Sequence, residues 1–328
     1  MILAHDITEI IPGKKKDVAF TKGTVIKAAD VERLLDLGKR HLYVFDGNVE
    51  GVHEDDAGGR IARAIMGKHM EATAPKEGKV SIKSTVDGLF KVDPEMLYRL
   101  NTVKDVLVGT LPNRYPVKAG DVVAAARIIP LYIDEKSLAR VEKGWKNRKM
   151  ISILPFRSLT AGIVVTGSEV YDGRVPDSSH IVDAKLKNYG SSIIGKTVVT
   201  DDIGMIRNAI LDLFDKGADI VITTAGLSVD PDDVTREGIA ATGAKTIFYG
   251  TPIAPGAMFL LAALNGKYIL GAPACVYYSG YTALDIVLVR ILAGEKVSKR
   301  DVAMLGYGGL CTHCAPCHYP ACHFGKGL

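Results

Sequence analysis

From about residue 157 the chain alternates short, continuous apolar runs with segments whose apolar residues recur every three or four positions. The apolar runs predict β-strands at Ala161–Thr166, Ser191–Thr200, Asp219–Thr224 and Lys267–Leu270. Helical spacing between and after them predicts helices at Val182–Tyr189, Ile203–Leu213 and Tyr281–Leu292. Strands that are covered by helices on both faces read as unbroken apolar runs and belong to parallel sheets. Residues 157–297 are therefore expected to form a three-layer, doubly wound, mostly parallel α/β domain.

The first part of the chain, residues 1–75, shows shorter and more mixed patterns. It predicts an amphipathic helix at Ala28–Gly38, a strand at His41–Phe45 and a second helix at Gly59–Met66. We interpret residues 1–75 as an α+β region.

Residues 76–156 are rich in β-branched residues and are punctuated by Gly, Pro and Asn, which predicts short strands joined by turns. The predicted strands are Lys79–Thr85, Gly88–Val92, Val106–Thr110 and Val122–Arg127. Their spacing favours a small barrel or sandwich. The charged segment Glu135–Lys149 predicts a connecting helix after this β-rich region.

Length and composition agree with a globular chain of several domains. The 328 residues exceed one ordinary domain. An apolar fraction of 47% and a charged fraction of 24% exclude a collagen-like, coiled-coil or disordered chain. Residues 298–328 form a last region, the C-terminal tail, which holds four of the five cysteines.

Charge and hydropathy limit the classes of partner that we expect for this chain. The net charge of +4 is modest and the basic residues are spread along the chain, so nucleic acid is not an expected partner. Lys14–Lys16 indicates a solvated loop. No secretory signal is apparent, and apolar stretches such as Met258–Leu264 and Ile286–Leu292 are shorter than the about 20 residues that span a bilayer. We expect a cytoplasmic protein without membrane contact.

Two predicted strands end in polar, glycine-containing loops. The first loop runs from Thr166-Gly167-Ser168-Glu169 to Asp177-Ser178-Ser179, and the second from Thr223 through Ser228 to Asp232-Asp233-Val234-Thr235. Ligands of doubly wound sheets bind outside the carboxyl ends of the strands. Hydroxyls and backbone N–H groups there bind phosphate, and carboxylates beside them hold Mg²⁺. Taken singly, Asp177 and Asp233 are equally consistent with helix N-caps; taken together, the two loops favour a binding site.

The two loops resemble the molybdopterin-binding domain of the MoeA/MogA family. TGSEVYDGRVPDSSHIVDAKLKNYG and TTAGLSVDPDDVTREGI carry the resemblance, which extends through Pro255-Gly256 and Ile269–Pro273 to Leu292. TKGTVIKAADVERLLDLGKRHLYVF is similar, more weakly, to the region that precedes this domain in the MoeA branch. The chain departs from the family at Ala225 and Asp230, where glycines are usual, in the segment 271–276, and in lacking the D-G-Y-A motif.

The resemblance implies binding of molybdopterin or its adenylated form. One branch of the family adenylates molybdopterin and the other inserts molybdate into the product with a divalent cation, here Mg²⁺. By carry-over, Asp233 is the key catalytic acid, with Asp177 and Glu169 as supporting carboxylates. The ligand-binding residues are Thr166, Gly167, Ser178, Thr223, Thr224, Gly226 and Ser228. Relatives of this domain oligomerise, which implies a homo-oligomer.

Three functions stay open from the sequence. The leading expectation is an enzyme of molybdenum cofactor biosynthesis that resembles a molybdopterin molybdenumtransferase. The DD-x-T pattern at 232–235 is shared with CinA-like relatives, which hydrolyse nucleotide pyrophosphates. A non-catalytic cofactor carrier or sensor is the third.

The C-terminal tail carries a second chemical signal. Cys311, Cys314, Cys317 and Cys322 are spaced C-x2-C-x2-C-x4-C, and His313, His318 and His323 lie among them. Four thiolates this close in sequence suit either Zn²⁺ or an iron–sulfur cluster. Such a centre would suit redox sensing or docking to other molybdenum cofactor proteins and molybdoenzymes. Cys275 indicates a small buried hydrophobic residue.

Overall fold

The computed structural model describes residues 1–45, 50–145 and 148–327 and divides the chain into two compact units. The first unit comprises Met1–Thr85, Val92–Leu111 and Ala119–Ser152, and the second Val86–Lys91, Pro112–Lys118 and Ile153–Leu328. This grouping follows spatial contacts and not the four consecutive regions expected from the sequence. Two segments of the β-rich region pack with residues that come much later in the chain.

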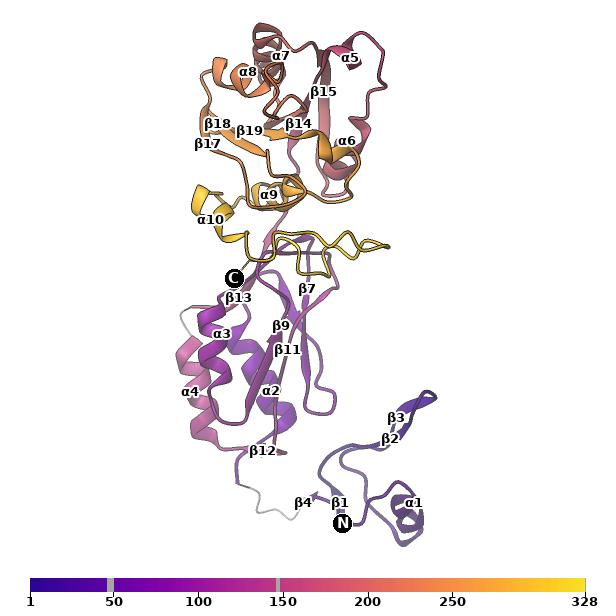
Figure 1. Ribbon diagram of the computed structural model, residues 1–328. Coiled ribbons are helices and arrows are strands. Elements are labelled where there is room, and N and C mark those ends of the chain that lie inside the picture. Colours follow the sequence, from indigo (N-terminus) through magenta and orange to yellow (C-terminus); the bar gives the residue numbers. More distant parts are fainter. Residues whose placement is uncertain (46–49, 146–147, 328) are drawn as a thin grey trace. The chain divides into compact units, whose positions relative to one another are not determined.

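The first unit is built around an open, antiparallel sheet (Figure 1). Its strands lie in the order β6 (Met70–Ala72), β7 (Val80–Ser84), β11 (Val122–Ile128) and β9 (Val106–Thr110). Helix α2 (Glu54–Ile65) packs on β11 and β7, and α4 (Glu135–Trp145) packs on α2. The predicted barrel or sandwich is therefore wrong, because helices and not a second sheet cover these strands.

Helix α3 (Pro94–Asn101) was not expected, yet the sequence encodes its start. The Asp93 carboxylate accepts hydrogen bonds from the backbone N–H groups of Glu95 and Met96, both at 3.1 Å, and Pro94 occupies the first helical position. Asp at the N-cap and Pro directly after it are favourable starts for a helix.

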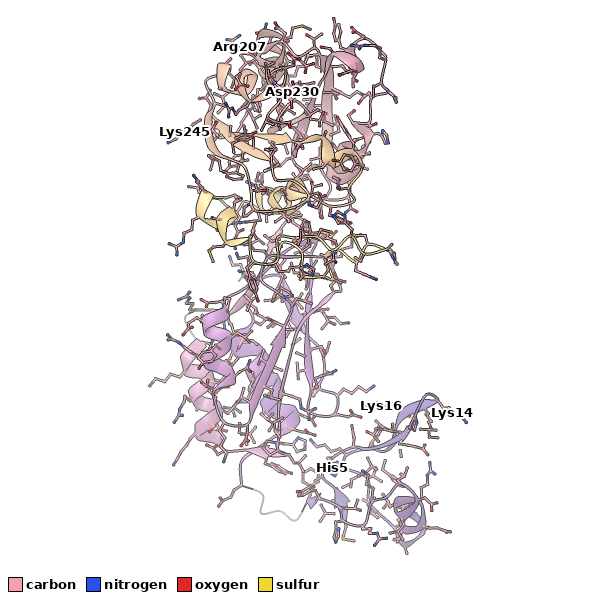
Figure 2. All side chains as sticks on the ribbon, viewed as in Figure 1. His5, Lys14, Lys16, Arg207, Asp230 and Lys245 are labelled. Carbon is pink, nitrogen blue, oxygen red and sulfur yellow. The ribbon has the colours of Figure 1, made fainter. Side chains whose placement is uncertain are left out.

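The N-terminal elements of the first unit are short. They are β1 (Ile2–Leu3), β2 (Ile7–Ile11), β3 (Lys15–Phe20), η1 (Ala28–Asp30), α1 (Val31–Asp36) and β4 (Val44–Phe45), and they are followed by β5 (Val52–His53) and, later, β12 (Tyr132–Ile133). Lys14 and Lys16, labelled in Figure 2, belong to the β2–β3 hairpin and are exposed. The basic cluster is thus part of a hairpin and not a plain loop.

The second unit contains a six-stranded sheet in the order β15, β14, β16, β19, β18, β17 (Figure 1). The strands are β14 (Thr160–Thr166), β15 (Ser192–Val199), β16 (Ile220–Thr224), β17 (Lys245–Tyr249), β18 (Leu260–Leu264) and β19 (Lys267–Ala272). Strand β18 is antiparallel to both of its neighbours, and the other strands run in one direction. The mostly parallel α/β fold is confirmed, and each of the four predicted strands is found within two residues.

Helices cover both faces of this sheet. They are α5 (Ser168–Tyr171), α6 (His180–Lys187), α7 (Ile203–Asp215), α8 (Thr235–Ala241), η2 (Ala274–Tyr277), α9 (Ala283–Leu292) and α10 (Lys299–Met304). On β16, Ile220 and Ile222 join the core on the side of α6 and α9, whereas Val221 joins the core on the side of α7 and α8. This alternation explains why Ile220, Val221 and Ile222 are all apolar.

Three further strands, β8 (Gly88–Val92), β10 (Tyr115–Val117) and β13 (Ile151–Pro155), form a separate sheet that belongs mainly to the second unit. An ionic network ties this sheet to the end of the chain: Arg114 contacts Glu295 and Asp301, each at 3.1 Å. The buried Arg290 of α9 contacts the same two carboxylates, at 2.7 and 3.1 Å. Such pairing is what allows a guanidinium to stay charged in a core.

The C-terminal tail is a folded part of the second unit. Its Phe324 is 2% exposed and lies in the core cluster that includes α9. The backbone of Cys311 donates to the Ala254 carbonyl (2.8 Å), and the Ala254 N–H donates to the Gly309 carbonyl (2.8 Å). Among the described residues, no helix has the length and apolar character needed to cross a membrane.

Candidate functional site

The point where the strand order reverses lies between β14 and β16. From β14 the chain crosses to β15 on one side, and the next strand, β16, pairs on the other side. At such a point the loops that follow two adjacent strands diverge and leave a crevice at the carboxyl edge of the sheet. The two loops singled out by the sequence follow these two strands.

Three buried threonines join the ends of β14 and β16 beneath this crevice. The Thr166 hydroxyl donates to the Thr224 carbonyl (2.8 Å) and shares a hydrogen bond with the Thr235 hydroxyl (3.0 Å). Thr235 opens α8, so the hydroxyl pair ties the helix N-terminus to the neighbouring strand. The hydroxyl groups of Thr166 and Thr235 form their hydrogen bonds within the protein and are buried. They hold the two loops in fixed positions relative to each other.

The second loop turns sharply directly after β16. Ala225 and Gly226 both have positive φ angles, 70° and 63°. A Cβ atom on Gly226 would lie 2.1 Å from the Thr235 hydroxyl oxygen, so only glycine fits there. Ala225 takes up a left-handed conformation that is unfavourable for an L-residue with a side chain. The turn geometry is therefore kept although one glycine of the expected pair is alanine.

The first loop is held by an aspartate from β15's end. The backbone N–H and the hydroxyl of Ser168 both donate to the Asp201 carboxylate, at 2.9 and 3.0 Å. Gly167 precedes it with a φ of 136°, and Glu169 is exposed. The adjacent Asp202 instead caps α7, accepting from the Met205 N–H at 2.7 Å.

Asp177 lies at the far end of the first loop and is bound by three donors. It accepts from the Ser179 backbone (2.8 Å) and hydroxyl (3.0 Å) and forms an ion pair with Lys196 of β15. Burial acts to raise the pKa of this carboxyl, but Lys196 and Ser179 outweigh it, so the pKa lies below its usual value. Asp177 is thus a stable anion, and Ser178 beside it is half-buried.

A third loop, after β19, completes this edge of the sheet. The Tyr277 hydroxyl donates to the Thr224 side chain (2.6 Å). Burial raises the pKa of Tyr277, and the negative charge of Asp177 adds to the effect. Tyr277 therefore lies between the end of β16 and the first loop, a position that sequence reasoning missed.

The second loop frames a pocket of about 400 Å³. Its lining residues are Leu227, Ser228, Val229, Asp230, Pro231, Asp233, Val234, Arg236, Glu237 and Tyr249. The Asp233 carboxylate accepts from the Ser228 N–H (2.7 Å). The Arg236 guanidinium lies 5.3 Å from the centre of the Tyr249 ring, and the Tyr249 hydroxyl donates to the Leu227 carbonyl (2.7 Å). Figure 2 labels Asp230 in this part of the unit. The pocket combines carboxylates, a guanidinium and an aromatic ring.

The structure separates the predicted residues into groups. Thr166 and Thr224 meet through hydrogen bonds, Ser228 meets Asp233, and Asp177 lies with Lys196. Neither Asp177 nor Asp233 is an N-cap: α6 is preceded by Ser179 and α8 by Val234. The Thr223 hydroxyl is buried with no hydrogen-bond partner among the described residues.

Sequence reasoning missed five residues of this region as parts of the site: Arg236, Tyr249, Lys196, Asp201 and Tyr277. The sequence could have indicated Asp201, because it too follows the carboxyl end of a strand of the parallel sheet. The others lie within helices, strands or the short 3₁₀ helix η2, where no local pattern marks them.

The sequence predicted metal sites in the two polar loops and in the C-terminal tail. Within residues 1–45, 50–145 and 148–327, no three or more His, Cys, Asp or Glu side chains are grouped to hold a metal ion. Mg²⁺ does not need such a group, because it is commonly held by one or two carboxylates together with substrate phosphates. Mg²⁺ and the metal of the cysteines stay predictions.

Comparison with known families agrees with the sequence resemblance. Residues 162–297 match the model of a family described as a probable molybdopterin binding domain. The expected resemblance is thereby confirmed for this part of the chain. Residues 1–46 match a family described as a domain of unknown function.

Curated relatives match a shorter stretch. A CinA-like protein of Frankia casuarinae is 42% identical over 83 residues, 25% of this chain and 17% of the relative. A CinA-like protein of Thermosipho melanesiensis is 33% identical over 88 residues, 26% of this chain and 22% of the relative. The chain thus spans only about a fifth of the length of these relatives.

Solved structures are similar to part of this chain. The Mog protein of molybdopterin biosynthesis from Mycobacterium ulcerans is 19% identical, with 42% of this chain and 99% of that chain covered and a TM-score of 0.35. The protein CinA from Thermoplasma acidophilum is 22% identical, with 36% and 89% covered and a TM-score of 0.32. The fold assignment rests on the order and direction of the strands in the six-stranded sheet.

Proposed function

We propose that residues 162–297 bind molybdopterin, or its adenylated form, in the crevice between the loops that follow β14 and β16. The observation that carries the proposal is the placement of both motif loops at the point where the strand order reverses. Ligands of doubly wound sheets bind there because the diverging loops leave room and present backbone N–H groups. The match of this segment to a probable molybdopterin binding domain supports the choice of ligand.

The second loop is proposed to supply the chemistry. Asp233 borders the 400 Å³ pocket with its carboxylate fixed by Ser228, a suitable position for an Mg²⁺ ion that also contacts substrate phosphate. Arg236, stacked on Tyr249, brings positive charge to the same pocket. In the first loop, Asp177 is neutralised by Lys196, so its proposed role is to position the loop. Glu169, which is exposed, is proposed to contact the ligand or its metal.

The binding test is anaerobic titration calorimetry of the full chain with adenylated molybdopterin and Mg²⁺. Asp233→Asn is expected to weaken Mg²⁺-dependent binding at least tenfold and to abolish turnover. Asp215→Asn is the matched control, because Asp215 is exposed at the end of α7, where the chain returns to the opposite edge of the sheet. Equal loss in both variants, or no loss in Asp233→Asn, would overturn the site.

We further propose that the chain is an enzyme that inserts molybdate into the bound, adenylated pterin. The assay is molybdate-dependent release of AMP with Mg²⁺ present. Tight pterin binding without turnover would instead make the protein a carrier or sensor of the cofactor.

A nucleotide pyrophosphatase of the CinA-like type is the second candidate. The observation in its favour is the 42% identity to a CinA-like protein over 83 residues. Hydrolysis of ADP-ribose, together with failure to bind the pterin, would select this candidate over the first.

A further inference from the structure

The four cysteines of the C-terminal tail line a single cavity. Its volume is about 280 Å³, and Cys311, Cys314, Cys317 and Cys322 all contribute to its wall, together with His313 and His323. All four thiols are free, and none is part of a disulfide. The cavity shares no lining residue with the pocket of the second loop.

The backbone that carries these cysteines is anchored at both ends. On one side the Cys311 N–H donates to the Ala254 carbonyl (2.8 Å), which fixes the start of the segment on the α/β domain. On the other side Phe324 is buried in the core, directly after Cys322 and His323. Cys311 and Cys322 are half-buried and Cys314 and Cys317 are exposed, so two thiols are fixed and two lie on the loop between them.

Aromatic rings form one wall of this cavity. The rings of Tyr281 and Tyr319 lie 4.2 Å apart between their centres, and Phe324 packs against Tyr319 edge-on at 6.4 Å. Apolar walls around a metal centre limit the access of water and lower the local dielectric, which strengthens metal–thiolate bonds.

Two hydrogen bonds prepare the polar groups for a metal. The backbone N–H of His313 donates to the Cys311 sulfur (3.4 Å), which helps to fix the position of this sulfur. The His323 Nε2 atom lies 2.9 Å from the Leu310 carbonyl, and because a carbonyl only accepts, Nε2 carries the proton. Nδ1 is then the ring nitrogen that is not used by this contact, as in metal-binding histidines whose other nitrogen donates to a carbonyl.

We propose that this cavity binds one thiolate-ligated metal centre, either a Zn²⁺ ion or an iron–sulfur cluster, through Cys311, Cys314, Cys317 and Cys322. In the described part of the chain the four thiols share the cavity wall without forming a preassembled ligand group. Binding therefore requires the exposed Cys314 and Cys317 to move toward the anchored Cys311 and Cys322. Each ligating thiol loses its proton to solvent as its sulfur binds the metal, so binding is coupled to ordering of the loop and becomes tighter as pH rises.

The test measures the metal content of the full chain purified without oxygen and again after incubation with Zn²⁺ alone, or with Fe³⁺, sulfide and a thiol reductant. One Zn²⁺ per chain identifies a zinc site. Visible sulfur-to-iron charge-transfer absorption that bleaches on reduction identifies a cluster. Either result supports the proposal, and failure of the chain to hold either metal under all these conditions overturns it.

Variants show whether the metal lies in this cavity. Cys314→Ser combined with Cys317→Ser should lower the metal affinity by more than about 100-fold, since loss of outer partners alone costs about 10–100-fold. Both positions are exposed, so the fold should persist, and circular dichroism checks it. Cys275→Ser is the matched control, because Cys275 is half-buried outside the cavity. Retained affinity in the double variant, or equal loss in Cys275→Ser, refutes the site. The result is independent of pterin binding.

Discussion

Ala225 offers a direct test of how the loop after β16 is built. Its φ of 70° places an L-residue with a side chain in the left-handed region, which costs roughly 1–2 kcal/mol. Glycine accepts this conformation without that cost, but it loses about 0.5–1 kcal/mol more conformational entropy on folding than alanine. The difference predicts that Ala225→Gly stabilises the second unit by about 0.5–1 kcal/mol.

The assay must report on the second unit alone. Trp145, the single tryptophan, belongs to α4 of the first unit, so its fluorescence follows the wrong part of the chain. Hydrogen exchange of the β16 amides, followed by mass spectrometry, reports the opening free energy of the sheet that Ala225 adjoins. The predicted gain corresponds to about a two- to fivefold slower exchange of these amides.

Ala240→Gly is the matched control. Ala240 is exposed within α8 of the same unit, where a glycine costs about 1 kcal/mol, so exchange should become faster. Two results would refute the predicted free-energy cost of the left-handed conformation at Ala225. One is faster exchange in Ala225→Gly as well, and the other is unchanged exchange in Ala225→Gly while the control behaves as expected. Because the backbone of Ala225 is tied to the Ala272 carbonyl (2.9 Å), the loop itself should not rearrange.

Other perturbations follow from buried charges and close contacts in the second unit. Burial acts to raise the pKa of Asp301, but hydrogen bonds from Ser298 and the charge of Arg290 outweigh it and bring the pKa to about 2. Since the unfolded pKa is about 3.9, this carboxylate contributes about 2 kcal/mol above pH 4 that is lost as pH falls toward 2. Asp301→Asn should therefore be destabilising at neutral pH and nearly neutral at pH 2, as measured by urea unfolding. Lys185→Met should cost about 3–5 kcal/mol, because Lys185 pairs at 2.7 Å with Asp285, which is buried and whose pKa burial raises. Adding Asp285→Leu should restore most of that loss in the same unfolding assay, and no recovery would show that packing dominates. Gly226→Ala should slow pterin association and lower the melting temperature, because its Cβ would lie 2.1 Å from the Thr235 hydroxyl oxygen.

The α/β unit was largely predictable because its central strands, such as β14 and β16, are covered on both faces. The side chains of β16 are buried on both sides of the sheet, so its first three residues are all apolar and the run stands out in the sequence. The first unit gave a weaker pattern. In β7, buried and half-exposed residues alternate, and local periodicity cannot tell whether a helix or a second sheet covers the buried face. The helices α2 and α4 decided that question.

The candidate site shows the same division between local pattern and spatial arrangement. The sequence by itself determined that two polar loops follow two apolar strands, because strand ends, glycines and carboxylates are local features. Only the tertiary structure decided that β14 and β16 are neighbours, and that Asp201 holds Ser168 while Asp202 caps α7. It likewise placed β8 and β10 with residues far along the chain, and the tail cysteines around one cavity. Adjacent residues in a chain can make different long-range hydrogen bonds, and these depend on strand order, which no local spacing encodes.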